Sequence, residues 1–283
     1  MGNEVCYNLV MKLEGNIKKA KELLSESDAL FITAGAGMGV DSGLPDFRGV
    51  EGFWKAYPKA RELNLRFEEM ANPQWFESDP KLAWAFYGHR LQLYRDTVPH
   101  EGFRRLIALS NTKKYGSFVF TSNVDGQFQK AGFSEERVME CHGSIHHLQC
   151  LDDCREIIWS SDSTTVEIGE GFKAEDPLPT CPDCSGMARP NILMFGDWGW
   201  NHSRTDAQRE RLKAWIAKLA DAGAKLAIIE MGAGTAVPTV RNTSEKVAKE
   251  FNTPLIRINP RESFGADIEL PMGALEALES LIP

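Results

Sequence analysis

The sequence predicts an α/β fold in which a parallel sheet carries helices on both faces. Two observations support this prediction. Short apolar runs typical of buried strands alternate with longer segments of helical spacing. Glycines and polar residues gather where these runs end, and parallel sheets bind ligands at the carboxyl ends of their strands. We therefore expect the functional site at that edge of the sheet.

The N-terminal part of the chain supplies one helix, one strand and a helical region. Residues 15–28 have helical spacing and lead into a buried strand at 29–33. This strand runs into a glycine-rich stretch at 34–39, as a strand does when it enters a nucleotide-binding turn. Residues 53–98 are rich in aromatic residues and leucine and contain Asn-Pro and Asp-Pro breaks, so we expect several helices there.

The rest of the chain continues the alternation. We expect strands at 117–121, 138–140, 192–195, 225–230 and 254–259, and a long helix over about 204–222. The strand at 117–121 leads into a polar turn at 122–126, and the strand at 138–140 leads into Cys141-His142-Gly143. Both turns put polar groups where strands end.

Composition indicates a globular protein and argues against two classes of partner. The chain has 283 residues, 42% of them hydrophobic and 25% charged, which is enough to bury a full core. A formal net charge of −8 argues against nucleic acid, because phosphate binding relies on clustered Lys and Arg. No run approaches the roughly 18 apolar residues of a membrane span and the start lacks the pattern of a secretory signal, so we expect no membrane contact and a cytoplasmic location.

Four of the six cysteines form two close pairs, Cys150-x3-Cys154 and Cys181-x2-Cys184. In an intracellular chain this grouping is more typical of a structural zinc site than of disulfides. The alternative is that surface thiols are paired in the sequence by chance. Cys6 and Cys141 are left over.

The glycine-rich turn is ambiguous when taken alone. Gly35, Gly37 and Gly39 form G-x-G-x-G, which either makes a tight turn or lets the backbone approach a pyrophosphate. Further motifs follow it in a fixed order: Asp46-Phe47-Arg48-Gly49, Asn123-x-Asp125, His142-Gly143 and the paired cysteines. Together they resemble the sirtuins, NAD-dependent protein deacylases, and the matching positions span Ala34 to Asn259.

The resemblance implies a role for each matching residue. Ala34, Gly35, Ala36 and Gly37 would line the NAD phosphates, and Asp46, Phe47 and Arg48 would close over the nicotinamide side. Asn123 and Asp125 would hold the nicotinamide ribose and carboxamide, and His142 would be the general base. The resemblance also places Ser122, Gly232, Gly234 and Asn259 in the cofactor site.

These residue types suit the chemistry. Loss of nicotinamide leaves an oxocarbenium-like ribose carbon, which a weakly nucleophilic acyl oxygen captures only if NAD is held dry and oriented. A neutral imidazole then takes a proton from a ribose hydroxyl. We assign this role to His142 and interpret His146 and His147 as ordinary polar residues.

The resemblance also implies a domain division. We predict a Rossmann-like NAD-binding domain at 1–52, 100–147 and 190–283, a helical insert at 53–99 and a zinc-binding module at 148–189. In that module, which is similar to the sirtuin zinc ribbon, four thiolates would hold one structural Zn²⁺ in a closed tetrahedral site.

The helical insert carries a further match. Tyr87 and Arg90 fit the Tyr-x-x-Arg signature of the desuccinylase-type sirtuin branch, which removes acidic acyl groups. One helical turn separates them, so both can face one pocket, where the Arg90 fork would grip a carboxylate. The alternative is an amphipathic core helix whose Arg90 pairs with a surface acid. Phe195, Gly196 and Asp197 match the segment that pairs with the acylated protein or peptide.

Three departures from the sirtuin pattern keep other functions open. Ser122 replaces a glutamine, Gly232-Ala233-Gly234 lacks two hydroxyls, and Trp198-Gly199-Trp200 follows the substrate segment. We expect removal of acetyl groups and of succinyl or malonyl groups from protein lysines. The alternatives are ADP-ribosyl transfer or NAD hydrolysis on the same fold, and a non-catalytic NAD-sensing or zinc-dependent binding module.

Overall fold

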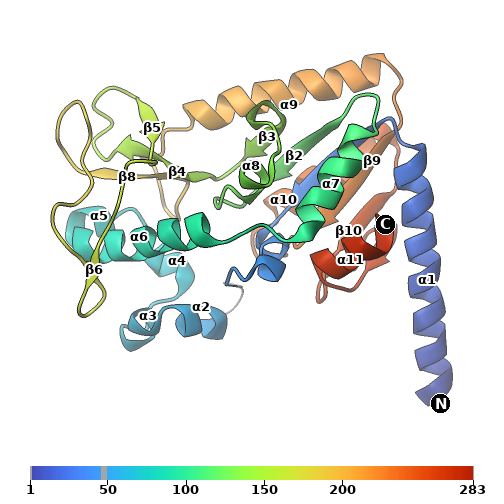
Figure 1. Ribbon diagram of the computed structural model, residues 1–283, viewed down its shortest axis with the longest axis horizontal. Coiled ribbons are helices and arrows are strands. Elements are labelled where there is room, and N and C mark those ends of the chain that lie inside the picture. The colour runs from blue at the N-terminus through green and yellow to red at the C-terminus, as the bar shows by residue number, and fades with distance from the viewer. Residues whose placement is uncertain (1, 46–49, 283) are drawn as a thin grey trace.

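A parallel sheet of six strands forms the centre of the protein (Figure 1). The computed structural model describes residues 2–45 and 50–282. Within them the strand order is β11-β10-β9-β1-β2-β3, in which the strands are β1 (Ala29–Ala34), β2 (Ser117–Thr121), β3 (Val138–Glu140), β9 (Leu226–Met231), β10 (Leu255–Ile258) and β11 (Ile268–Leu270). This is the strand order of the doubly wound dinucleotide-binding fold. The Rossmann-like sheet predicted from the sequence is confirmed.

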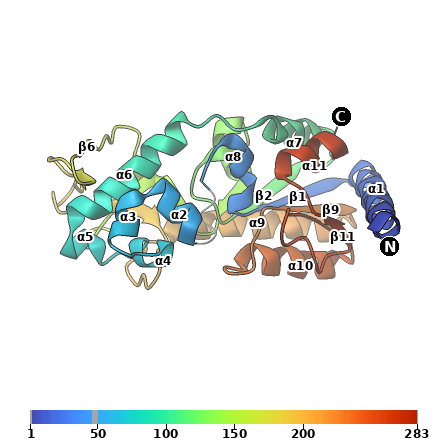
Figure 2. The ribbon, with the colours of Figure 1, turned by 90° about the horizontal axis from the view of Figure 1, so that it is seen from below.

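Helices cover both faces of this sheet (Figure 2). One face carries α7 (Glu101–Asn111), α8 (Gln127–Ala131) and α11 (Ala274–Leu281), the other carries α9 (Ser203–Asp221) and α10 (Thr239–Phe251), and α1 (Gly2–Glu26) runs beside β11. Successive side chains of β1 point to opposite faces of the sheet. Leu30 and Ile32 join the core of the α7 face, whereas Phe31 lies 6.3 Å, between ring centroids, from Trp215 of α9. A strand buried on both faces is expected to be apolar almost throughout, and every residue of β1 except Thr33 is apolar.

The second layer of the molecule joins short helices to small antiparallel sheets. The helices are α2 (Val50–Ala56), α3 (Pro58–Glu62), α4 (Phe67–Met70), α5 (Trp75–Ser78) and α6 (Pro80–Asp96). The strands are β4 (Gly143–Cys150), β5 (Ile158–Ser160) and β8 (Ala188–Ile192), in the order β5-β4-β8, and the pair β6 (Ile168–Gly169) and β7 (Lys173–Ala174). One hydrophobic cluster contains side chains from both groups, so the helices and small sheets share a core. The predicted three-part domain division stays a prediction.

Side-chain interactions determine where α6 begins and hold it against β8. Asp79 caps the helix, its carboxylate accepting from the Leu82 N–H at 3.2 Å, and Pro80 occupies the first helical position, where no N–H is needed. The indole N–H of Trp84 donates to the Ala188 carbonyl at 3.1 Å. This bond fixes α6 against β8, which places the middle of α6 beside the main sheet's ligand-binding edge.

The structure corrects one detail of the sequence prediction. The strand expected at 192–195 is instead β8, which ends at Ile192 and pairs antiparallel with β4 outside the main sheet. The apolar run continues past it, but the backbone leaves the ladder because Phe195 donates to the Ala71 carbonyl at 2.9 Å. In the glycine-rich stretch after β1 the chain forms two 3₁₀ turns, η1 (Ala36–Met38) and η2 (Val40–Ser42). A third 3₁₀ turn, η3 (Glu135–Arg137), precedes β3.

None of the helices that the structure describes is both long and apolar enough to cross a bilayer.

Candidate active site

A cavity of about 650 Å³ opens at the carboxyl ends of β1, β2 and β9 and continues to α6. It lies at the point of the strand order where the chain changes direction, the location at which open α/β sheets bind ligands. Five residues assigned to NAD binding line it: Gly35, Ala36, Ser122, Gly232 and Gly234. Asn123, Asp125, His142, Tyr87, Arg90 and Phe195 line it as well. Residues far apart in the sequence therefore share one cavity wall.

The loops after β1 and β9 touch each other at the cavity floor. The Gly35 N–H donates to the Met231 carbonyl at 2.9 Å, and the Gly37 N–H donates to the Gly232 carbonyl at 3.1 Å. A Cβ on Gly232, whose φ is +61°, would lie 2.4 Å from backbone atoms of Gly37 and Met38. Only glycine fits there, and the close approach leaves backbone at the position predicted for the pyrophosphate. Ala34 and Gly37 contribute backbone to this floor without lining the cavity.

Two buried asparagines connect these loops. The Asn123 amide donates to the Gly35 carbonyl at 3.1 Å, while its backbone N–H donates to the Thr121 hydroxyl at 3.0 Å. The Asn259 amide donates to the Ala233 carbonyl at 2.9 Å from behind the loop. Asn123 therefore borders the cavity, and Asn259 shapes it without lining it.

Asp125 is a buried carboxyl at the cavity wall. Burial is the main cause that raises its pKa to about 6, opposed by the hydrogen bond that its Oδ1 accepts from the Gln127 N–H at 2.9 Å. Behind it, His146 Nε2 donates to the Asp125 carbonyl at 2.9 Å. The backbone of this segment is thus tied from the side opposite the cavity.

His142 stands in the turn between β3 and β4 and lines the cavity. Burial lowers the pKa of its imidazole below 6.5, and a hydrogen bond to the Ser122 backbone carbonyl partly opposes that shift. The ring is therefore neutral at pH 7, the state a proton acceptor needs. The next residue, Gly143, has φ +76°, and a Cβ there would lie 2.1 Å from the Asn191 carbonyl oxygen. That approach fixes His142 against β8.

The α6 end of the cavity presents an aromatic cage around a cation. The Arg90 guanidinium lies 5.2–5.6 Å from the ring centroids of Phe67, Phe86, Tyr87 and Tyr94. Its Nε and Nη2 donate to the Tyr94 hydroxyl at 3.2 and 2.9 Å. Tyr94, which the sequence reasoning did not single out, lies one helical turn after Arg90 and lines the same cavity. Its spacing from Arg90 was the signal that could have found it.

Of the three predicted substrate residues in the segment after β8, one lines the cavity and two do not. Phe195 lines the cavity, whereas Gly196 and Asp197 do not. The Asp197 carboxylate is fully buried and accepts from Arg189 Nη1 at 2.9 Å and from the backbone N–H groups of Met194 and Gly199 at 3.1 Å. Asp197 therefore shapes the loop, while Trp198 beyond it is 99% exposed.

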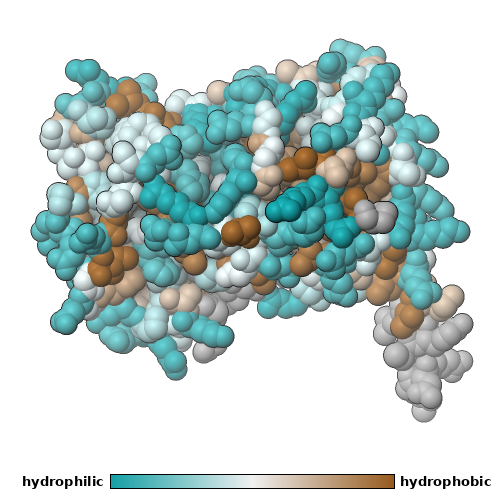
Figure 3. All heavy atoms as spheres, in the orientation of Figure 1, coloured by the Kyte–Doolittle hydropathy of each residue, from teal (hydrophilic) through white to brown (hydrophobic). Residues whose placement is uncertain are grey.

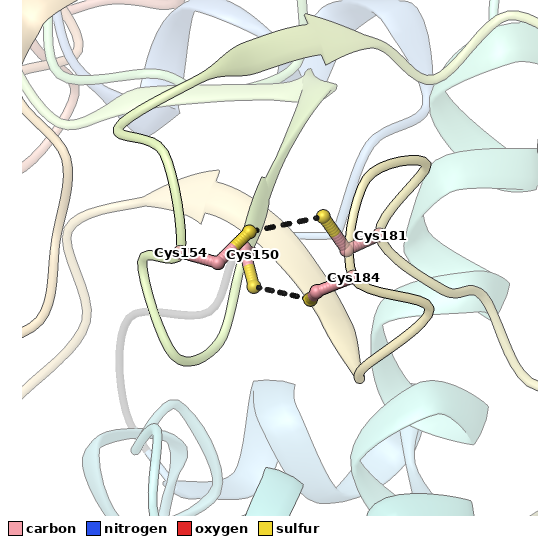
Figure 4. Close-up of side chains that lie close together, drawn as sticks. All are labelled: Cys150, Cys154, Cys181 and Cys184. Atoms are coloured by element: carbon pink, nitrogen blue, oxygen red, sulfur yellow. Dashed lines mark hydrogen bonds between the residues drawn. The ribbon is translucent and has the colours of Figure 1, made fainter.

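The four paired cysteines converge at one point (Figure 4). All four Sγ atoms lie within 4.8 Å of one another, with 3.6 Å between Cys150 and Cys184 and between Cys154 and Cys181. Tetrahedral thiolates at a Zn–S distance of about 2.3 Å would be roughly 3.8 Å apart. The donor set and its spacing fit a closed structural Zn²⁺ site, and the cysteines come from β4, the loop after it and the loop before β8.

Sequence reasoning also missed cavity residues in the loop after β10. Arg261 and Glu262 line the cavity, and Glu262 accepts from the Thr235 hydroxyl at 2.8 Å across the mouth. Their position directly after a predicted strand was the available signal. Asp46, Phe47 and Arg48, predicted to close over the nicotinamide, lie outside the described residues.

The chain matches known proteins along most of its length. The sequence profile of the Sir2 family covers residues 35–224. This chain belongs to the Sir2 family. It is similar to solved structures of a Sir2 homologue with ADP-ribose (TM-score 0.71, 26% identity, 93% of this chain and 94% of that one) and of a Sir2 homologue with NAD (0.71, 26%, 94% and 92%).

Curated Sir2 relatives carry names that describe an activity. An NAD-dependent protein deacylase of Pyrococcus furiosus is 34% identical over 63% of this chain, which spans 65% of that relative. A protein of Aeropyrum pernix with the same name is 29% identical over 93% of this chain and 95% of its own length. A deacylase of Leptospira interrogans is 30% identical, with 84% of each chain covered.

Proposed function

We propose that this Sir2 protein is an NAD-dependent protein-lysine deacylase that releases nicotinamide, O-acyl-ADP-ribose and free lysine. One observation carries the proposal: His142, Asn123 and Asp125 meet the glycine floor in a single cavity at the sheet's ligand-binding edge. The names of the relatives and the structures solved with NAD and ADP-ribose agree with it.

The residues divide the work of binding and proton transfer. The floor at Gly35 and Gly232 leaves backbone free of side chains for the NAD pyrophosphate. Asn123 and Asp125 lie where the ribose and carboxamide are expected, and the buried environment that raises the Asp125 pKa also excludes water. The neutral His142 imidazole takes the ribose hydroxyl proton, so that the oxygen can attack the carbon of the acyl adduct.

The metal has a structural role in this proposal. Four thiolates from Cys150, Cys154, Cys181 and Cys184 would complete the coordination of Zn²⁺, which supplies a crosslink and no chemistry at the substrate. The site holds the loops around β4 and β8 together. Because His142 directly precedes β4 and Phe195 lies in the segment that follows β8, the metal would stabilise the active-site wall indirectly.

We further propose that acidic acyl groups, succinyl and malonyl, are substrates beside acetyl. Arg90 supplies a buried positive charge at the α6 end of the cavity. The Tyr94 hydroxyl accepts two hydrogen bonds from Arg90, and among the described residues its own proton has no acceptor. The Tyr87 hydroxyl is buried without a partner in the same part of the chain, and burial raises its pKa to about 12, so it remains a donor. A substrate carboxylate would satisfy both hydroxyls.

Acylated proteins or peptides are the proposed partners, bound beside Phe195. We also propose a cytoplasmic location, supported by four cysteines that are arranged to bind metal as thiolates.

Mass spectrometry of reactions with NAD and either acetyl-lysine or succinyl-lysine peptide tests the proposal. We expect nicotinamide and O-acyl-ADP-ribose from the wild type and no O-acyl-ADP-ribose from His142→Ala, because His142 acts after nicotinamide has left. NAD consumption that leaves the peptide acylated would instead support ADP-ribosyl transfer or NAD hydrolysis. NAD binding without any turnover would support the binding-module alternative.

A further inference from the structure

A second cavity of about 300 Å³ lies behind the Asp125–Gly126 segment, on the side opposite the active site. It is formed by the end of α6, α8, η3, β4 and the start of α9. Hydrophilic side chains gather over the region where α6 and α8 approach each other on the face shown in Figure 3. No role that we assign to NAD, zinc or the acyl peptide uses this cavity.

The lining is rich in nitrogen donors. Three permanent cations, Arg95, Lys130 and Arg204, border the cavity with two imidazoles, His146 and His147. The only carboxylate among the described lining residues is that of Glu135. Glu140 offsets Arg204 from outside the cavity, at 2.6 Å. The lining is therefore positively charged in a protein whose net charge is −8.

Several of these side chains are held in place by hydrogen bonds but keep a nitrogen or an N–H group that can bind a further partner. Lys130 Nζ donates to the carbonyls of Arg95 and Thr97, which leaves the third N–H of the ammonium. Arg204 Nη2 binds Glu140, whereas its Nη1 is buried and has no partner in the described part of the chain. His147 Nδ1 is likewise buried without a partner there. Buried polar atoms without partners are costly, so Arg204 Nη1 and His147 Nδ1 are the atoms that a bound ligand would most benefit.

We infer that this second cavity binds a small oxyanion of the phosphate class. Donors converge on it from α6, α8, β4 and α9, and a tetrahedral oxyanion presents acceptors in several directions at once, whereas a carboxylate presents them in one plane. Phosphate oxygens between Lys130, Arg204 and His147 would satisfy the orphaned atoms. The same chemistry fits inorganic phosphate and the phosphate group of a small phosphomonoester.

The site also contacts the backbone that carries an active-site residue. His146 Nε2 donates to the Asp125 carbonyl, and its ring fills the space that a Cβ on Gly126 would enter, 2.6 Å away. Tyr94 lines both cavities. An oxyanion beside His146 is therefore separated from the active site by one peptide segment and one aromatic ring.

Histidine side-chain NMR with inorganic phosphate, at constant ionic strength, tests the inference. We expect the His146 and His147 resonances to shift and saturate together, whether or not NAD turnover is ever observed. Lys130→Gln and, separately, His147→Phe should weaken phosphate binding by about tenfold, the size expected for one hydrogen bond to a charged group. His147→Phe removes an unpartnered buried nitrogen, so its folding should be unimpaired, which thermal unfolding checks.

Lys213→Gln is the matched control, because Lys213 pairs with Glu210 on α9 and does not line the cavity. Glycerol 2-phosphate, titrated in parallel, separates the two sources: tighter binding than inorganic phosphate assigns the site to a phosphomonoester, and weaker binding assigns it to the free anion. Shifts that appear only at His142, shifts that never saturate, or equal weakening by Lys213→Gln would overturn the inference.

Discussion

Replacing Arg90 with methionine should change acyl preference more than it changes catalysis. Arg90 is 5% exposed and its guanidinium is enclosed by four aromatic rings, and methionine keeps an unbranched chain that packs against them. The substitution removes the charge that would pair with a succinyl carboxylate. It leaves the loops that are proposed to hold NAD unchanged.

The magnitude follows from the contact that is lost. A hydrogen bond to a charged group contributes about 1.5–3 kcal/mol net, which corresponds to a factor of about 10 to 150 in kcat/KM. That factor should appear for succinyl-lysine peptide and be largely absent for acetyl-lysine peptide, whose acyl group is neutral. The ratio of the two values cancels a general loss of active enzyme.

The assay is nicotinamide release with both peptides at saturating NAD, comparing wild type, Arg90→Met and Arg66→Met. Arg66 is an exposed residue before α4 that pairs with Glu69, and it serves as the control. Equal losses of kcat/KM on the two peptides would refute the reasoning and favour a purely structural role for Arg90 in the aromatic cage. Tyr94→Phe should lower the same ratio, because it removes a hydroxyl that both accepts from Arg90 and retains a free proton.

Four further predictions rest on single observations. Because burial lowers the His142 pKa below 6.5, the acidic limb of the kcat/KM profile for acetyl-lysine peptide should fall below pH 6.5; a limb above that value contradicts the assignment. Cys154→Ser or treatment with a strong chelator should lower Tm and release one equivalent of zinc, measured by metal analysis; an unchanged metal content in the variant would exclude the site. Asp197→Asn should cost about 3–5 kcal/mol in chemical denaturation, because it leaves Arg189 as a buried unpaired charge. The Asp125 pKa of about 6 lies above its ordinary value of 3.8, so the folded state binds more protons between these values and the free energy of unfolding falls as pH rises through that window. Asp125→Asn should remove about 3 kcal/mol of that fall in a pH series of chemical denaturation. An unaltered profile would count against the raised pKa.

Much of the main sheet could be read from the sequence because its strands are buried on both faces. The runs at 29–34, 117–121 and 226–231 are mostly apolar and lack the polar alternation of a half-exposed strand, a pattern that needs no knowledge of neighbours. Prediction failed at 192–195, where the residues are equally apolar. There the strand ends because the backbone of Phe195 finds its partner at Ala71, far away in the sequence.

The candidate site was predictable where a motif puts its residues beside a strand end. Gly35, Asn123 and His142 each follow a strand, so their common location follows from the parallel sheet. The helical spacing of Tyr94 from Arg90 was readable in the sequence, but its place at the border of both cavities and the second cavity itself were not. They depend on how α6 packs across the Asp125–Gly126 segment, and no local pattern reports that packing.

The sequence by itself determined the elements, the fold class and the chemical types at the strand ends, because periodicity and glycine positions act locally. The tertiary structure decided which polar side chains form hydrogen bonds or ion pairs within the fold and which remain available to bind a ligand. Asp197 carries a carboxylate like any candidate ligand group, but the buried Arg189 takes it. His147 appeared ordinary in the sequence, yet its Nδ1 is left without a partner among the described residues. Hydrogen-bond satisfaction is a property of the packed molecule, since a partner can come from any distance along the chain.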